Sequence, residues 1–149
     1  MKATSRRTPG ATALRGVMLC ASLGAAASAY ALAAPDLPPE QHQGAVSFRT
    51  GGIGEDESKA MQQAAHQYPL ELEFVSRSGD SAGGYLADVD VAIRDAHGSP
   101  VLQTRADGPF LLAKLPPGRY TVTAQYQASQ LSRRVEIPAH GAQHVLFGW

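Results

Sequence analysis

Cysteine and asparagine are the residues that this sequence most lacks. Its 149 residues include one cysteine, Cys20, and no asparagine. A chain with a single cysteine cannot close an internal disulfide or build a site with several thiolate ligands. Without asparagine the chain has no acceptor for N-linked glycosylation. These two absences exclude disulfide scaffolds, zinc sites of the multi-cysteine kind and N-glycoproteins.

Net charge of either sign is also missing, because thirteen Lys and Arg balance thirteen Asp and Glu. The balance hides an asymmetry along the chain. Residues 1–33 hold Lys2, Arg6, Arg7 and Arg15 and no acid, so residues 34–149 have nine bases, thirteen acids and a net charge of −4. A body with this charge has no overall positive field for a phosphate backbone. We therefore expect no nucleic-acid partner.

Residues 1–33 have the parts of a secretory signal peptide. A basic start is followed by the uncharged run GVMLCASLGAAASAYALA, and small residues occupy the positions before a cleavage site between Ala33 and Ala34. The alternative is an anchor that stays in the membrane, but the run falls short of the roughly 20 residues that span a bilayer. We predict export to the periplasm or the medium, with Cys20 removed and no stable membrane insertion after cleavage.

The next two segments differ in character. Residues 34–50 contain three prolines and little periodicity, which predicts a linker or an N-terminal arm. Residues 51–67 begin with the glycine-rich run GGIG and three consecutive acids, and apolar residues then recur at a spacing of three to four. Acids are stabilised at a helix N-terminus by the helix dipole. We predict a Gly-rich loop and a short helix over about 55–67.

From residue 68 onward, apolar and polar residues alternate, as in LELEF and VDVAI. Alternation of this period is typical of strands with one buried face, and turn signals rich in Gly, Pro and Asp separate the segments. The predicted strands are 69–76, 86–94, 101–105, 110–114, 119–126, 131–137 and 144–149. This spacing predicts an all-β fold over residues 68–149, a seven-stranded antiparallel sandwich of Ig-like type with one short N-terminal helix.

One stretch carries a family pattern. The segment YLADVDVAIRDAHGSPVLQTRADGPFLLAKLPPGRYTVTAQY combines two strands around a D-x-x-G turn, then D-G-x-F, then L-P-P-G-x-Y-x-V. With these motifs, residues of about 85–137 resemble the carboxypeptidase regulatory-like, transthyretin-like β-sandwich domains. The resemblance implies the sandwich, in which Tyr120 anchors its strand by packing inward. Such domains serve as peptidase accessories, carbohydrate-binding-like units and periplasmic proteins, so the resemblance implies a fold more than a function.

Enzymes that share this sandwich carry motifs that this sequence does not have. Hydroxyisourate hydrolases end in Tyr-Arg-Gly-Ser, whereas this chain ends in LFGW. Tyr120, Tyr126, His140 and His144 do not fall in the iron-binding motif of intradiol dioxygenases. The sequence shows no Ser-His-Asp grouping either. We predict a protein that is not an enzyme, and a hydrolase of unknown type is the least favoured alternative.

Two sets of residues have side chains that can bind a metal ion, but their spacing in the sequence does not bring those side chains together. His140 and His144 flank Gly141 in a turn that enters a strand, where four residues separate the imidazoles by about 13 Å. The acids of residues 55–57 have the oxygen ligands that calcium prefers, but three consecutive carboxylates cannot all converge on one ion. The sequence therefore predicts no metal and no cofactor.

Two surfaces remain as binding candidates. The loop made by residues 51–57 is not required by the sandwich, and we predict that it contacts an unidentified protein partner; its residues are Gly51, Gly52, Ile53, Gly54, Glu55, Asp56 and Glu57. The alternative is an aromatic platform for a glycan, formed by Tyr85, Phe110 and Trp149. The platform requires that at least two of these rings lie exposed on one face. The sequence thus predicts an exported interaction module, with carbohydrate binding as the alternative.

Overall fold

The alternating pattern makes most of the described chain β-structure. The computed structural model describes residues 37–77 and 83–149, so the predicted signal peptide and its cleavage site lie outside the described residues. Within these two ranges there are ten strands in two sheets, one α-helix and one 3-10 helix. Each of the seven predicted segments contains a strand, and the expected number of seven was wrong because three further strands are present.

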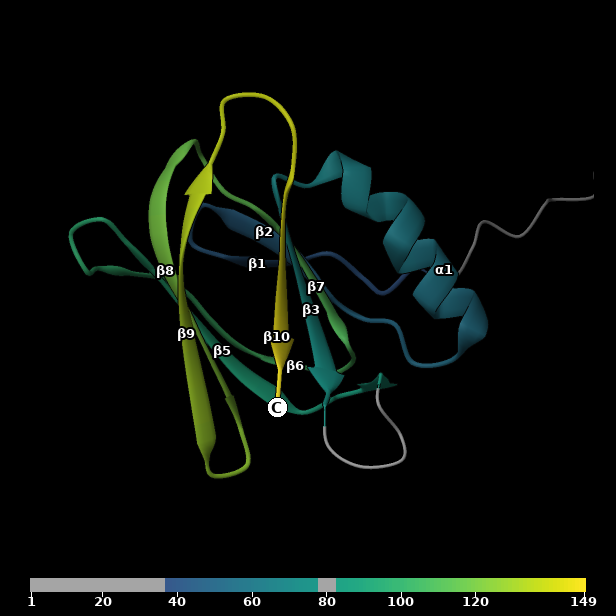
Figure 1. Cartoon of the computed structure of the whole chain (residues 1–149). Coiled ribbons are helices and arrows are strands. Elements are labelled where there is room, and N and C mark those ends of the chain that lie inside the picture. The colour runs from purple at the N-terminus through teal and green to yellow at the C-terminus, as the bar shows by residue number, and fades with distance from the viewer. Residues whose placement is uncertain (1–36, 78–82) are drawn as a thin grey trace, which may run out of the picture. The chain divides into compact units, whose positions relative to one another are not determined.

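The first sheet, sheet A, has the strand order β1-β2-β7-β3-β10, and β4 also pairs with β3 (Figure 1). Its strands are β1 (Gln41–Gln43), β2 (Val46–Gly51), β3 (Leu70–Ser76), β4 (Gly84–Tyr85), β7 (Phe110–Lys114) and β10 (Gln143–Gly148). All its pairs are antiparallel except β10 and β3, which run parallel. This pair corrects the prediction of a purely antiparallel sandwich.

The second sheet, sheet B, is a four-stranded antiparallel sheet with the order β6-β5-β8-β9. Its strands are β5 (Val89–Asp95), β6 (Pro100–Ala106), β8 (Gly118–Tyr126) and β9 (Ser129–Ile137). At the start of β8, the hydroxyl of Tyr120 donates a hydrogen bond to the carbonyl oxygen of Pro116 at 2.9 Å. The Pro-Pro-Gly corner and the strand that follows it are tied together by this bond.

Residues 34–50 are not only a linker, because their described part contains β1 and β2. Val46 and Phe48 alternate with more exposed neighbours and are buried, and β2 pairs with β7 along five residues of its length. The burial of these two side chains in the common core explains why this proline-containing segment joins the sheet. Two apolar residues were too short a pattern to predict a strand.

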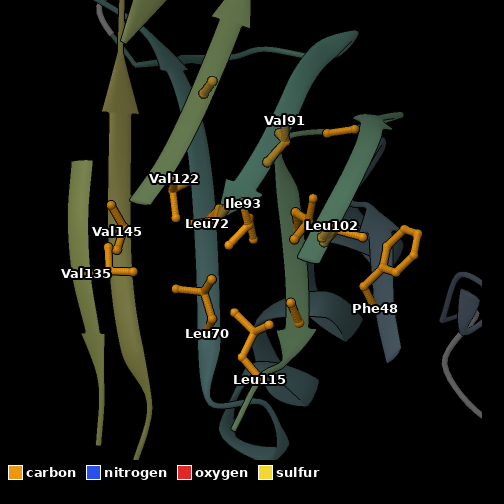
Figure 2. Close-up of a cluster of buried hydrophobic side chains, with 14 of the residues drawn as sticks. Phe48, Leu70, Leu72, Val91, Ile93, Leu102, Leu115, Val122, Val135 and Val145 are labelled. Carbon is orange, nitrogen blue, oxygen red and sulfur yellow. The ribbon is translucent and has the colours of Figure 1, made fainter. Parts of the chain in front are cut away.

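A single hydrophobic core lies between the two sheets. Figure 2 shows Leu70 and Leu72 of sheet A facing Ile93 and Val122 of sheet B. Apolar side chains from both sheets make up nearly all of the cluster, with Leu115 added from the segment between β7 and β8, so the pair of sheets is compatible with the predicted sandwich. The sheets are also joined at their edges, where the backbone N–H of Gln103 donates to Oε1 of Gln43 at 2.6 Å and the Trp149 indole donates to the Ser129 carbonyl at 3.2 Å.

The predicted helix is present as α1 (Glu55–Ala64), followed by η1 (Ala65–Gln67). It packs on the side of sheet A that faces away from β8 and β9 (Figure 1). Met61 is fully buried there against Phe110 and Leu112 of β7. Strand β7 is therefore covered on both faces, which explains why its sequence FLLA is continuously apolar rather than alternating.

Candidate functional site

The predicted interaction loop is held in one shape by close packing at its glycines. Gly52 has a φ of 99°, and a Cβ atom there would overlap the Phe110 ring. A Cβ atom on Gly108 would overlap the backbone of Gly51, so these two chain segments touch directly. Next to them, the hydroxyl of buried Thr50 donates to Oδ2 of Asp107 at 3.0 Å. The glycines are thus accounted for by packing and backbone conformation.

Two of the three acids of the loop, Glu57 and Glu55, make contacts of different kinds. Glu57, the third residue of α1, reaches back past the helix start to accept hydrogen bonds from the N–H groups of Gly52 at 2.6 Å and Ile53 at 3.4 Å. Glu55 forms an exposed ion pair with Lys59, one helical turn on. Among the described residues, no group of three or more His, Cys, Asp or Glu side chains is arranged to hold a metal ion.

Exposed apolar side chains lie in this loop and on segments that pack near it. Ile53 is 63% exposed, the largest exposed fraction of any large apolar residue that the structure describes, and Tyr85 is 50% exposed. The Phe110 ring links the two, because it lies against Gly52 and its centroid is 5.4 Å from that of Tyr85. Leu37, also partly exposed, precedes the proline that packs on Gly51. We call Leu37, Ile53 and Tyr85 the apolar rim.

The three rings of the predicted sugar platform do not lie exposed together. Phe110 is only 1% exposed, because it is buried beneath α1 and Tyr85. Trp149 packs against Phe147 and Tyr126. Tyr85 is the one exposed ring of the three. Phe110 cannot belong to such a platform because strand β7 is covered on both sides, and Trp149 is only partly exposed.

The two candidate histidines at the end of the chain are placed differently. His144 lies on β10, where its Nε2 is 2.9 Å from Oε2 of Glu73 on the neighbouring strand β3. His140 lies exposed in the turn before β10. No metal-ligand group of the described residues includes either of them.

The structure also contains a polar network that sequence reasoning missed. The Tyr68 hydroxyl donates to Oε1 of Glu40 at 3.0 Å and accepts from Nε of Arg49 at 2.7 Å. Lys114 donates to the same Glu40 oxygen at 2.8 Å, and Arg49 also donates to the Pro38 carbonyl oxygen. The network fastens residues 38–40 to the outer face of sheet A.

Hydrogen bonds in this network favour the charged forms of both Glu40 and Lys114. The hydrogen bond from Lys114, followed by that from Tyr68, lowers the pKa of Glu40 below its ordinary value. The hydrogen bond to Glu40 in turn raises the pKa of Lys114. Four residues separated by up to 74 positions form this cluster, so no local sequence pattern predicts it.

No model of a known protein family matches the chain, and none of the curated proteins searched matches it at the significance required. None of the helices in residues 37–77 and 83–149 is long and apolar enough to cross a membrane.

Proposed function

We propose that this chain is an exported, non-catalytic module that binds a protein partner through the Gly51–Glu57 loop and the apolar rim. The observation that carries the proposal is the 63% exposure of Ile53 on a loop held by close packing. A loop that is already ordered loses little conformational entropy on binding, so an apolar side chain at its tip is an efficient contact. Export rests on the signal-like residues 1–33.

The surroundings of the rim suggest the chemistry of the partner. Glu55 and Asp56 lie exposed in the first turn of α1, two and three residues after Ile53, and Asp107 is exposed beside Thr50. Charge complementarity across an interface favours an opposite charge on the partner. We therefore propose a partner surface with an apolar pocket at its centre and Lys or Arg side chains around it.

The finer fold assignment is part of the same proposal. The Tyr120–Pro116 hydrogen bond has the form of the tyrosine corner found in Ig-like sandwiches, where a strand tyrosine bonds to the backbone a few residues upstream. It supports a transthyretin-like, Ig-like type for the two sheets. Non-catalytic modules of this type have their contacts in loops at the ends of the strands, which agrees with the position of the loop between β2 and α1.

The proposal is tested with a photo-crosslinking amino acid at position 53 of the exported chain, in living cells. A protein trapped from position 53 but not from His97, an exposed turn residue between β5 and β6, is purified and titrated against the chain. We expect Ile53→Asp to weaken its binding about tenfold or more, as for an apolar anchor at an interface centre. Gln62→Asp, an exposed change on α1, is the matched control.

Two results would contradict the proposal. One is equal trapping from positions 53 and 97, which indicates a chance encounter in the cell. The other is an Ile53→Asp chain that binds the purified partner as tightly as the parent chain does.

A further inference from the structure

The outer face of sheet B is a bare polar surface. In the described chain, no helix or strand packs on this face, since α1 contacts β2 and β7 of the other sheet. Alternate residues of its four strands point away from the core. They are Asp90, Ala92, Arg94, Gln103, Arg105, Arg119, Thr121, Thr123, Gln125, Gln130, Ser132, Arg134 and Glu136. None of the exposed large apolar residues of the described chain is among them.

The strand register gathers three arginines at one end of this face. Thr121 of β8 lies opposite Arg94 on one side and opposite Arg134 on the other. Arg119 stands two residues before Thr121 on the same strand, so it is also on this face. Neighbouring strands are about 4.8 Å apart, so the Arg119 and Arg134 side chains can reach the space above Thr121. Arg94 donates from Nη1 to the carbonyl oxygen of Gly98 at 2.9 Å. We call Arg94, Arg119 and Arg134 the arginine cluster.

The arginine cluster is positively charged, and only some of its charge lies near acidic side chains. Neither Arg119 nor Arg134 has an ion-pair partner within 4.0 Å among the described residues. Two acids are near: Glu136 lies opposite Arg119, and Asp95 uses its carboxylate to accept hydrogen bonds from backbone N–H groups of its own turn. A surface hollow of about 500 Å³ lies here, and its lining includes Arg119, Thr121 and Arg134 as well as both acids.

A second hollow continues along the same face toward the other end of β8. It has a volume of about 340 Å³ and is lined by amide, hydroxyl and carboxylate groups, among them Thr123, Gln125 and Gln130. These side chains supply donors and acceptors in neighbouring positions. Gln125 lies six positions after Arg119 on β8, a span of about 20 Å in a strand. The arginines thus lie at one end of the face, and the rest of it presents amide and hydroxyl groups together with Asp90 and Arg105.

We propose that this face binds an acidic oligosaccharide, one whose sugar units carry carboxylates. The arginine cluster would pair with carboxylates, which guanidinium groups bind in charge-assisted hydrogen bonds. The amide and hydroxyl rows would bind sugar hydroxyls, which need both donors and acceptors. An acidic peptide fits less well, because peptide and protein contacts depend on buried apolar anchors, and this face has none. The site lies on the other sheet from the apolar rim and is independent of the function proposed above.

The test titrates the purified chain with a galacturonate tetramer and follows backbone amide shifts by NMR. We expect shifts on β8 and β9, and about tenfold weaker binding in each of Arg119→Gln and Arg134→Gln. Arg133→Gln is the matched control, since Arg133 is next to Arg134 on β9 but points to the opposite face, over the Phe147 ring. All three arginines are exposed, so these variants should fold.

Two further ligands separate the sources of affinity. The methyl-esterified tetramer keeps the sugar hydroxyls without the charge, and tetraglutamate keeps the charge without the sugar. The proposal is supported if both of these ligands bind more weakly than the galacturonate tetramer does. It is overturned if the galacturonate tetramer causes no shift at millimolar concentration or if either comparison ligand binds as tightly. It is also overturned if Arg133→Gln weakens binding as much as Arg134→Gln, because the effect is then one of net charge.

Discussion

At the scale of single residues, Gly52 determines the shape of the Gly51–Glu57 loop. We expect Gly52→Ala to destabilise the protein by about 2–4 kcal/mol, because the new methyl group overlaps the Phe110 ring and the backbone has a positive φ. Urea unfolding of the parent and variant chains measures the difference. Gly44→Ala is the control, because Gly44 also has a positive φ but has open space around it.

The control isolates the packing contribution. Gly44→Ala should cost only the backbone strain, about 1–2 kcal/mol. If the two variants are equally stable, contact with Phe110 does not hold the loop, and the basis for an ordered interaction loop is lost.

At the scale of secondary structure elements, the start of α1 depends on one of its three acids. Glu57→Ala removes the acceptor of the Gly52 and Ile53 N–H groups, and we expect a loss of about 0.5–2 kcal/mol. Glu55→Ala removes only an exposed ion pair and should cost less than about 0.5 kcal/mol. Thermal unfolding of both variants compares them, and equal losses would mean that general charge at the helix start, rather than the Glu57 contacts, is responsible.

The elements that sequence predicted well are those with a long local period. β5 and β8 alternate over seven and nine residues, and the helix over 55–67 has its apolar residues at helical spacing. Strand β2 was missed because only Val46 and Phe48 carry its pattern. The parallel pairing of β10 with β3 joins residues about 70 positions apart, and no turn residue specifies it.

The candidate sites also differ in how far the sequence predicted them. The loop of residues 51–57 was predicted because it stands out from the strand pattern, and the structure adds that its glycines are packed and that Ile53 is exposed. The arginine cluster was not predicted, because Arg94, Arg119 and Arg134 become neighbours only through the register of β5, β8 and β9. Phe110 was a candidate ring of the sugar platform because the sequence does not show that α1 covers β7.

At the scale of the whole molecule, the strands of sheet B carry more bases than acids, whereas α1 and β3 carry more acids than bases. Five of the nine bases in residues 34–149 are arginines on the strands of sheet B, whereas α1 and β3 on the other side contribute five acids. A molecule with net negative charge can therefore present a positive face locally. The apolar rim with its acids and the arginine cluster are suited to different ligands.

The attachment of residues 38–40 to sheet A should depend on pH. Lys114 and Tyr68 lower the pKa of Glu40 in the folded state. Their hydrogen bonds to the Glu40 carboxylate therefore stabilise the fold fully above the ordinary pKa of 4.5. This stabilisation is lost as the pH falls through the lower pKa of the folded state. We expect the stability difference between the parent chain and Glu40→Gln to be largest near pH 7 and to shrink steadily below about pH 4.5. Urea unfolding at a series of pH values measures it, with Glu55→Gln as the control for an exposed acid. A difference that stays constant from pH 7 to pH 3 would show that the carboxylate charge of Glu40 does not hold residues 38–40 against Tyr68 and Lys114.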